Sequence, residues 1–356
     1  MYPKIEINSN NIVENVKRVK ALCEKNGVDL CVVTKVLSDN KELVKKMVEN
    51  GVTAICESRI ENFISYKDLD VEKWLIRIPM ECEIPDVVKY SDVSLNSELY
   101  TIIKLNDEAK KQNKVHKVVL MYELGDLREG CLESEINKVM EEALKLSNIE
   151  VYGIGTNLSC YGGILPSDEN MKELARVAES LEQRFNYKLK YVSGGNSTSF
   201  KMLQEGKLPG RINNLRFGEA VFFGNIPCYE LPIKDLNRNN FILKCQVIEV
   251  KEKPSLPWGN RATCNSCGYS LEEMPFEDKG IRKRAIIALG KQDIIIDGIK
   301  PVDNKIKILD GSSDHIILDV TDSNKSYRVG DIVEFNLNYS GVLSAMTSKY
   351  VKREIV

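Results

Sequence analysis

The alternation of short β-branched segments with amphipathic stretches is the feature that most constrains this fold. Eight strand-like segments occur between residues 29 and 224, at 29–34, 52–55, 74–78, 92–95, 117–123, 149–154, 189–193 and 213–217. Helical periodicity occurs at 10–26, 40–50, 97–112, 133–147 and 168–186, and Asn40 and Gly51 suit the two ends of the second of these helices. Eight βα units predict a (β/α)8 TIM barrel. An open doubly wound sheet is the alternative, although no GxGxxG motif opens a first helix.

After Gly224 the pattern changes to short strands separated by turn residues. The strands are expected at 241–251, 284–290, 293–297, 305–309, 315–320 and 332–338. A single helix is expected at 340–347, and 253–280 is expected to form a long loop. We therefore expect a barrel at 8–225 and an all-β domain at 226–356, with the N-terminal strand in 1–7 packing on the β domain.

Charge and cysteine usage narrow the class of protein. The 50 Lys and Arg residues balance 52 Asp and Glu residues, for a net charge of −2, which argues against nucleic-acid or anionic-membrane partners. Scattered cysteines in apolar runs, and no apolar run long enough for a signal peptide or a membrane span, favour a cytoplasmic protein with buried thiols. The chain has only two histidines, His116 and His315, which disfavours a metal-dependent hydrolase or a Ser/His/Asp triad. No metal is therefore expected.

Three features at strand ends suggest pyridoxal phosphate as a cofactor. Lys35 follows an apolar strand, where desolvation favours a neutral, nucleophilic amine. The segment SGGNSTSF (193–200) and the segment RFGEAVFFG (216–224) suit a phosphate, since barrels often bind phosphate after strands 7 and 8. Arg216 could face the ring nitrogen. Each feature alone also fits a structural role: a snorkelling lysine, ordinary glycine turns, or an internal ion pair.

The motifs together resemble the alanine racemase family of fold-type III pyridoxal-phosphate enzymes, and within it the ornithine racemase branch. In the barrel they are VVTKVLSDN (32–40), YELGDLREG (122–130), GTNLSCYGG (155–163), SGGNSTS (193–199) and LRFGEAVFFG (215–224). In the β domain they are GKQDI (290–294), GSSDHIILDV (311–320) and YSGVLSAMTSKYV (339–351). The resemblance covers nearly the whole chain.

The resemblance implies roles for individual residues. Lys35 would hold the cofactor as an aldimine and act as one of two bases. Arg216 would hydrogen-bond the pyridine nitrogen and keep the ring neutral, because arginine does not release its proton. The phosphate would be held by Asn196, Ser197 and the backbone of Gly218 and Glu219. Arg128 would lie beside the phenolate and the substrate carboxylate, and Asn157 against the ring.

The second base departs from the family pattern. The family places a tyrosine in a GY-x-D context, where this chain has Lys291, and an aromatic residue after the lysine, where it has Asp39. Candidates for the base are Lys291, His315, Asp314, Tyr269 and Tyr339. In the family this base comes from the partner subunit, which implies a homodimer. A carboxylate for a distal substrate ammonium could come from Asp314, Asp293, Glu219 or Asp39. The pair Cys264 and Cys267 is expected to be free thiols.

The resulting hypothesis is a pyridoxal-phosphate-dependent racemase that interconverts L- and D-ornithine by two-base abstraction of the α-proton from an external aldimine. A non-catalytic pyridoxal-phosphate-binding protein is one alternative, disfavoured by the β domain, which single-barrel relatives lack. A racemase of lysine, alanine or serine, an aldolase and a decarboxylase are the others.

Overall fold

The chain divides into two compact units. The computed structural model describes residues 1–229, 231–260, 262–264 and 276–356. One unit, here called the barrel unit, comprises Ser9–Arg238, and the other, the β unit, comprises Met1–Asn8 and Asn239–Val356. The segment 226–238, which follows the expected border at residue 225, belongs to the barrel unit: Asn15 Nδ2 donates to the Asn237 carbonyl at 2.7 Å, and Asn237 N donates to Asn15 Oδ1 at 2.8 Å.

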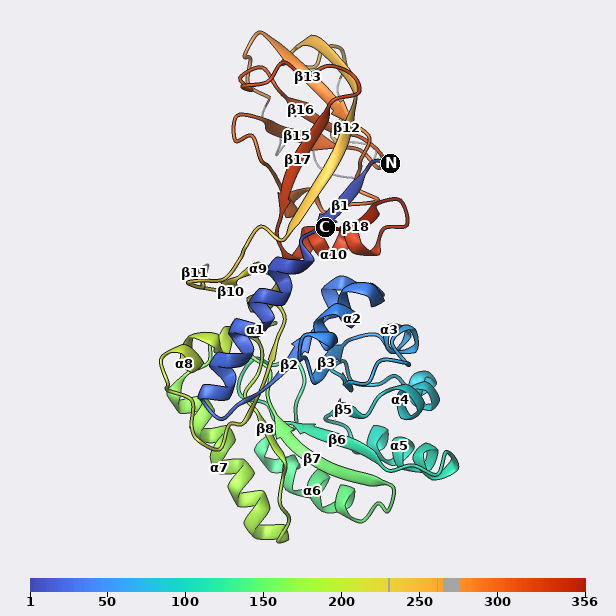
Figure 1. Ribbon diagram of the computed structural model, residues 1–356, viewed down its shortest axis with the longest axis vertical. Coiled ribbons are helices and arrows are strands. Elements are labelled where there is room, and N and C mark those ends of the chain that lie inside the picture. Colours follow the sequence, from blue (N-terminus) through green and yellow to red (C-terminus); the bar gives the residue numbers. More distant parts are fainter. Residues whose placement is uncertain (230, 261, 265–275) are drawn as a thin grey trace. The chain divides into compact units, whose positions relative to one another are not determined.

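Eight parallel strands close into a barrel, as the sequence predicts (Figure 1). They are β2 (Asp29–Val33), β3 (Ala54–Glu57), β4 (Glu72–Leu75), β5 (Val93–Asn96), β6 (His116–Met121), β7 (Ile149–Gly155), β8 (Tyr191–Ser193) and β9 (Asn214–Phe217). Pairing of β9 with β2, which sets Arg216 opposite Cys31, closes the ring. All eight expected strand segments overlap an observed strand.

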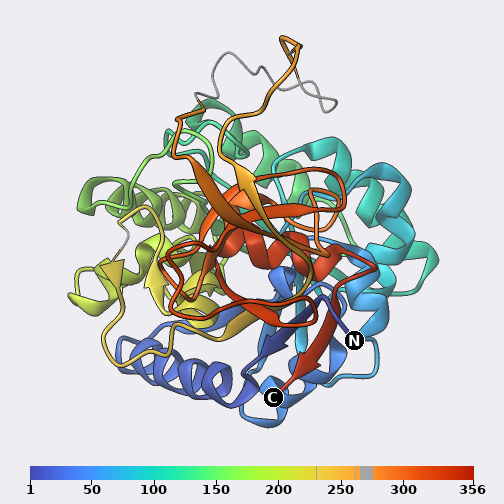
Figure 2. The ribbon, with the colours of Figure 1, turned by 90° about the horizontal axis from the view of Figure 1, so that it is seen from above.

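Helices surround these strands on the outside, as the view from above also shows (Figure 2). They are α1 (Ser9–Lys25), α2 (Lys41–Glu49), α3 (Ile60–Ser65), α4 (Ile84–Tyr90), α5 (Leu99–Lys111), α6 (Glu133–Leu144), α7 (Asp168–Phe185), α8 (Phe200–Gln204) and α9 (Glu219–Phe223), with 3-10 turns η1 (Lys35–Leu37), η2 (Glu81–Glu83) and η3 (Ser197–Ser199). Asn40 caps α2 through the N–H of Leu43, as expected. The unpredicted helices α3, α4, α8 and α9 are at most two turns long, which is too short for a helical period to stand out. No helix in the described part of the chain is long and apolar enough to cross a membrane.

Inward-facing side chains fill the barrel. Cys31, Cys56, Trp74, Tyr152 and Tyr191 belong to one buried cluster, in which the three aromatic rings lie 5.3–6.1 Å apart. A filled interior leaves the end of the barrel at which the strands terminate as the place for reactive groups. His116 on β6 is buried and bonded to Ser94 Oγ at 2.9 Å, and burial lowers its pKa to about 3. His116 is therefore a neutral core residue.

The β unit is built on an antiparallel sheet in the order β14-β17-β12-β13-β16-β15. Its elements are β12 (Phe241–Pro254), β13 (Ile281–Ile287), η4 (Ile296–Gly298), β14 (Ile299–Pro301), β15 (Lys307–Gly311), β16 (Ile316–Asp319), β17 (Ile332–Leu337), α10 (Tyr339–Thr347) and β18 (Lys352–Ile355). The N-terminal strand β1 (Lys4–Ile7) pairs with β12 and β18, so the expected N-terminal strand does pack with this unit. In the barrel unit, β10 (Asn225–Ile226) and β11 (Leu231–Pro232) form a small hairpin.

The expected strand at 293–297 is wrong. The N–H groups of Asp293 and Ile294 both donate to the Gly290 carbonyl, which makes a turn that runs on into η4. Ile294 is buried, whereas Ile295 is half exposed. The apolar run thus anchors a loop and does not extend the sheet.

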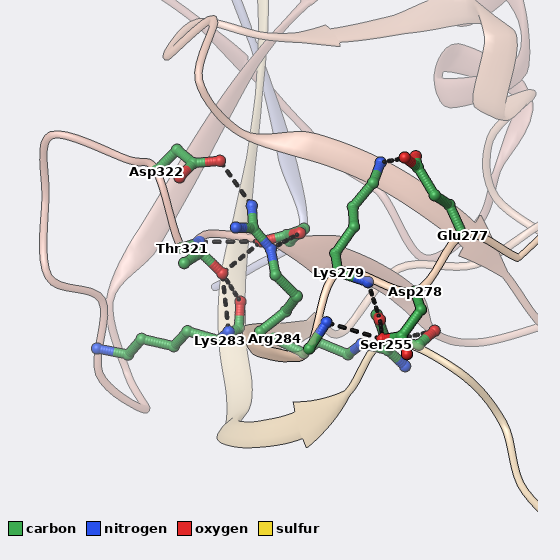
Figure 3. A network of polar contacts seen from close by, with 11 residues as sticks. Ser255, Glu277, Asp278, Lys279, Lys283, Arg284, Thr321 and Asp322 are labelled. Atoms are coloured by element: carbon green, nitrogen blue, oxygen red, sulfur yellow. Dashed lines mark hydrogen bonds and ion pairs between the residues drawn. The ribbon is translucent and has the colours of Figure 1, made fainter.

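A polar network joins the two ends of the segment that links β12 to β13 (Figure 3). Ser255 Oγ accepts from the Lys279 N–H at 2.7 Å, and the Ser255 carbonyl accepts from Arg284 Nη2 at 3.1 Å. The Lys283 N–H donates to Thr321 Oγ1 at 2.8 Å. The two Ser255 contacts close the base of the expected long loop 253–280, part of which lies outside the described residues, and the Thr321 contact ties β13 to the segment after β16.

Candidate active site

Lys35 begins η1 one residue after the end of β2, at the C-terminal end of the barrel. Its side chain is largely enclosed, and burial lowers the pKa of Lys35. The nearby Arg128 lowers this pKa further, whereas Cys160, Glu57 and Glu129 raise it. A lysine with a lowered pKa can act as a nucleophile and as a base near neutral pH.

Glu57, at the end of β3, is a buried acid beside Lys35 that the sequence reasoning missed. Its Oε1 accepts from Thr34 Oγ1 at 2.6 Å, and its Oε2 accepts from Asn62 Nδ2 at 2.9 Å. Burial raises the pKa of Glu57 to about 7, against these hydrogen bonds and the Lys35 charge. An acidic residue directly after an apolar strand was the available signal.

Ser197 and the start of α9 form a cluster of donors. The N–H of Gly218 donates to Ser197 Oγ at 3.2 Å, and the N–H of Ala220 donates at 3.1 Å. A Cβ on Gly218 would stand 3.0 Å from the Val33 carbonyl oxygen, so β2 and this loop approach closely here. Converging N–H and hydroxyl groups of this kind suit an anion such as phosphate.

Arg216 points into the barrel from β9 and is almost fully buried. Its guanidinium donates to Ser193 Oγ and, at 2.7 Å, to the Thr156 carbonyl. Burial lowers the pKa of Arg216, but a guanidinium keeps its proton in proteins. The contacts from β7 and β8 therefore fix a permanent charge in one orientation.

Asn157 and Asn196 link the loops that follow β7 and β8. Asn196 Nδ2 donates to Asn157 Oδ1 at 3.2 Å and to the Leu158 carbonyl at 2.7 Å, while Asn196 Oδ1 caps η3 through Thr198. Asn157 Nδ2 is buried and has no hydrogen-bond partner among the described residues. Asn196 thus has a clear structural task, whereas Asn157 presents an unused donor.

Arg128 lies on the loop after β6, and its guanidinium forms a two-point pair with Glu129. The neighbouring Asp126 is fully buried and accepts from the N–H groups of Cys160 and Tyr161, each at 3.0 Å. Although burial opposes it, these backbone bonds lower the pKa of Asp126. Asp126, also unforeseen, ties the Arg128 loop to the loop after β7.

The β unit gathers a second group of predicted residues. The backbone N–H of Lys291 donates to the Ser312 carbonyl at 2.9 Å, and Lys291 Nζ pairs with Asp310 at 3.1 Å. His315 Nδ1 lies 3.2 Å from Asp314 Oδ1, and both side chains are exposed. Hydrogen bonds from Ser313, His315 and Ser312 lower the pKa of Asp314. The structure therefore brings Lys291, Asp314 and His315 together on two adjoining loops.

Other predicted residues have separate positions. Asp293 is buried in the β unit and accepts from Ser348 Oγ at 2.8 Å. Asp39 is exposed, Tyr339 is half-buried at the start of α10, and Glu219 is half-buried at the start of α9. Cys264 is an exposed free thiol. Tyr269 and Cys267 lie outside the described residues.

Comparison with known proteins agrees with this architecture. The family model "Alanine racemase, N-terminal domain" matches residues 7–226. Ornithine racemase of Acetoanaerobium sticklandii is 46% identical over the full length of both chains. Lysine racemase of Thermotoga maritima is 38% identical over 99% of this chain and 98% of its own. Alanine racemase of Bartonella henselae with covalently bound pyridoxal phosphate matches the fold with a TM-score of 0.76, at 19% identity and with both chains fully covered.

The barrel, the enclosed lysine at its mouth and the full-length relatives define the chain as an amino-acid racemase, which is an isomerase. The chain belongs to the alanine racemase family.

Proposed function

We propose that the protein is a cytoplasmic, pyridoxal-phosphate-dependent racemase that interconverts L- and D-ornithine. The observation that carries the proposal is the convergence of Lys35, Arg216 and the Ser197 donor cluster on one end of the barrel. The choice of ornithine rests on the full-length likeness to ornithine racemase.

The residues present fit the cofactor. Its phosphate needs N–H and O–H donors, which Ser197, Gly218 and Ala220 supply; Asn196 and the Glu219 N–H would complete this set. Asn157 Nδ2 is a buried donor that still needs an acceptor, such as an oxygen of a bound group. Arg216 would hold the ring nitrogen. Bound pyridoxal phosphate would supply the electron sink that lets the α-proton of an amino acid leave.

Lys35 would move this proton on one face of the substrate. Burial lowers the pKa of its enclosed amine, so the neutral, proton-accepting form is easier to reach than in an exposed lysine. Arg128 would hold the substrate carboxylate in place of its present partner Glu129. Because Arg216 keeps its proton, the ring nitrogen would stay unprotonated, which favours return of the proton to the α-carbon over transamination.

The base for the opposite face would come from the cluster of Lys291, Asp314 and His315. Asp314 is held as a carboxylate beside His315 Nδ1, which suits it to orient the ring and leave Nε2 to exchange a proton. Lys291 is the second candidate. By analogy with the family we propose a homodimer in which the partner subunit supplies this base.

A lysine racemase is the second candidate, because the lysine racemase relative is also matched along its whole length. The β unit and its Lys291–Asp314–His315 cluster disfavour a protein that only binds the cofactor.

The test is a panel of single enantiomers of ornithine, lysine, alanine and serine, each followed by chiral chromatography after incubation with the holoenzyme. Ornithine should invert fastest, and failure to invert any basic amino acid would refute the proposal. Borohydride reduction followed by peptide mapping should label Lys35, and a label elsewhere would refute its assignment.

The dimer is tested by mixing two inactive variants, Lys35→Ala and His315→Ala, in equal amounts. If each site combines residues of two subunits, the mixture should recover about a quarter of wild-type activity, because a quarter of the sites are then intact. No recovery after subunit exchange would contradict the shared site. A second mixture, of Lys35→Ala with Lys291→Ala, repeats the experiment for the other candidate base. Recovery of activity in one mixture and not in the other would distinguish His315 from Lys291.

A further inference from the structure

A carboxylate and an amide side chain, those of Glu219 and Asn225, meet beside the barrel mouth. Glu219 begins α9, one residue after the end of β9, and is half-buried; Asn225 Nδ2 donates to Glu219 Oε1 at 3.2 Å. Asn225 Oδ1, on the same amide, is buried and finds no hydrogen-bond donor among the described residues. The amide is therefore oriented toward the carboxylate by its nitrogen, and its oxygen is left unused.

The pair lies at the same end of the barrel as Lys35. Strand β9 pairs with β2 through Phe217 and Val32, and Gly218 packs against Val33. Glu219 follows Gly218 directly, and Lys35 lies two positions after Val33, so both residues stand just beyond the ends of β9 and β2. Burial raises the pKa of Glu219, while the Asn225 hydrogen bond and the Lys35 charge lower it. Glu219 and Lys35 are therefore close enough to interact electrostatically.

No Lys, Arg or His of the described chain lies within 4.0 Å of the Glu219 carboxylate. Cations of the barrel unit pair with other acids, as Lys117 does with Glu72, Arg128 with Glu129 and Arg211 with Glu182. A partly buried carboxylate with no paired cation is costly, and so is a buried amide oxygen with no donor. Both costs are removed by one group that carries a positive charge and several N–H donors. A primary ammonium, with three N–H donors, meets this requirement.

We propose that Glu219 and Asn225 Oδ1 bind the distal ammonium of a diamino acid substrate. This assignment rests on the proposed function, and it makes the Glu219 side chain a specificity determinant while its backbone faces the phosphate cluster. The other carboxylates considered for this task have other surroundings: Asp293 is bonded to Ser348, Asp314 to His315 and two serines, and Asp39 is exposed.

The test compares ornithine with norvaline, which has the same carbon chain and no distal ammonium. In the Glu219→Gln holoenzyme, kcat/KM for ornithine should fall about 10- to 100-fold, the loss expected for hydrogen bonds to a charged group. The value for norvaline should stay unchanged or rise. Asn225→Leu, which keeps the carboxylate, should lower the value for ornithine by a smaller factor and leave norvaline unaffected.

Two further measurements separate substrate binding from other causes. The cofactor content of each variant, read from absorbance, should match the wild type, and the Kd for ornithine, read from the change in cofactor absorbance on titration, should rise in step with KM. Glu205→Gln makes the same substitution at an exposed acid of the barrel unit and should change none of these values.

Different results would overturn the ammonium site and the proposed racemase function. Equal losses for ornithine and norvaline in Glu219→Gln, with cofactor content intact, would overturn the ammonium site and leave the racemase standing. A wild-type protein that inverts no basic amino acid would overturn the proposed function, and the ammonium site with it.

Discussion

Replacing Glu57 with glutamine should change how the stability of the barrel unit depends on pH. Free glutamate loses its proton near pH 4.5, whereas the buried Glu57 keeps it up to about pH 7. Between these values the native state binds one more proton than the unfolded state, so wild-type stability falls as pH rises through this window and stays level above it. One pKa unit corresponds to 1.36 kcal/mol, so the full loss is about 3 kcal/mol.

Glutamine has no proton to lose and fits the same contacts. Its carbonyl can accept from Asn62 Nδ2, and its amide can donate to Thr34 Oγ1, which in turn lies 3.3 Å from the Cys56 carbonyl. Wild type and Glu57→Gln should therefore have similar stability at pH 5. By pH 8 the variant should be the more stable of the two by about 3 kcal/mol.

The assay is urea unfolding at a series of pH values, followed by tryptophan fluorescence. Trp74 is buried in the barrel and Trp258 is exposed, so the emission shift on unfolding reports the barrel unit. Glu179→Gln, at an exposed position on α7, is the matched control and should follow the wild-type curve. Parallel curves for wild type and Glu57→Gln from pH 5 to 8 would refute the reasoning, since Glu57 would then titrate alike in both states.

Three further variants test close contacts. Gly218→Ala places a Cβ 3.0 Å from the Val33 carbonyl and should weaken retention of pyridoxal phosphate about tenfold on dialysis; unchanged retention would contradict the phosphate assignment. Gly290→Ala places a Cβ 2.1 Å from the Ser313 carbonyl and should lower the melting temperature of the β unit by several degrees, which calorimetry would detect or disprove. Asp126→Asn removes a charged acceptor from the N–H groups of Cys160 and Tyr161, so hydrogen exchange at these amides should accelerate at least about tenfold. Unchanged exchange rates would show that Asp126 does not hold the loop after β7.

The barrel and its lysine could be predicted from the sequence because each depends on a local pattern. Eight apolar segments of four to seven residues stand out against amphipathic helices, and Lys35 directly follows one of them. The 293–297 segment shows the limit of such patterns, since Ile294 is apolar because it anchors a turn. The short helices α8 and α9 contain too few residues for any period.

The missed site residues depend on contacts between distant segments. Glu57 owes its raised pKa to burial, which outweighs the hydrogen bonds from Thr34 and Asn62, and Asp126 owes its role to backbone N–H groups that lie more than thirty positions later in the chain. Glu219 is among the carboxylates that the sequence offers for a substrate ammonium, but its partner Asn225 becomes visible only through an amide oxygen that has no donor among the described residues. Composition and spacing carry no information on such burial.

The most direct test of the central claim follows single enantiomers of ornithine in deuterium oxide with the holoenzyme. Wild type should convert either enantiomer to an equal mixture and place one solvent deuteron at the α-carbon of the inverted product. Lys35→Ala should lower this inversion by at least about a thousandfold. Inversion at the wild-type rate in Lys35→Ala, or none in the wild type with pyridoxal phosphate bound, would contradict the account.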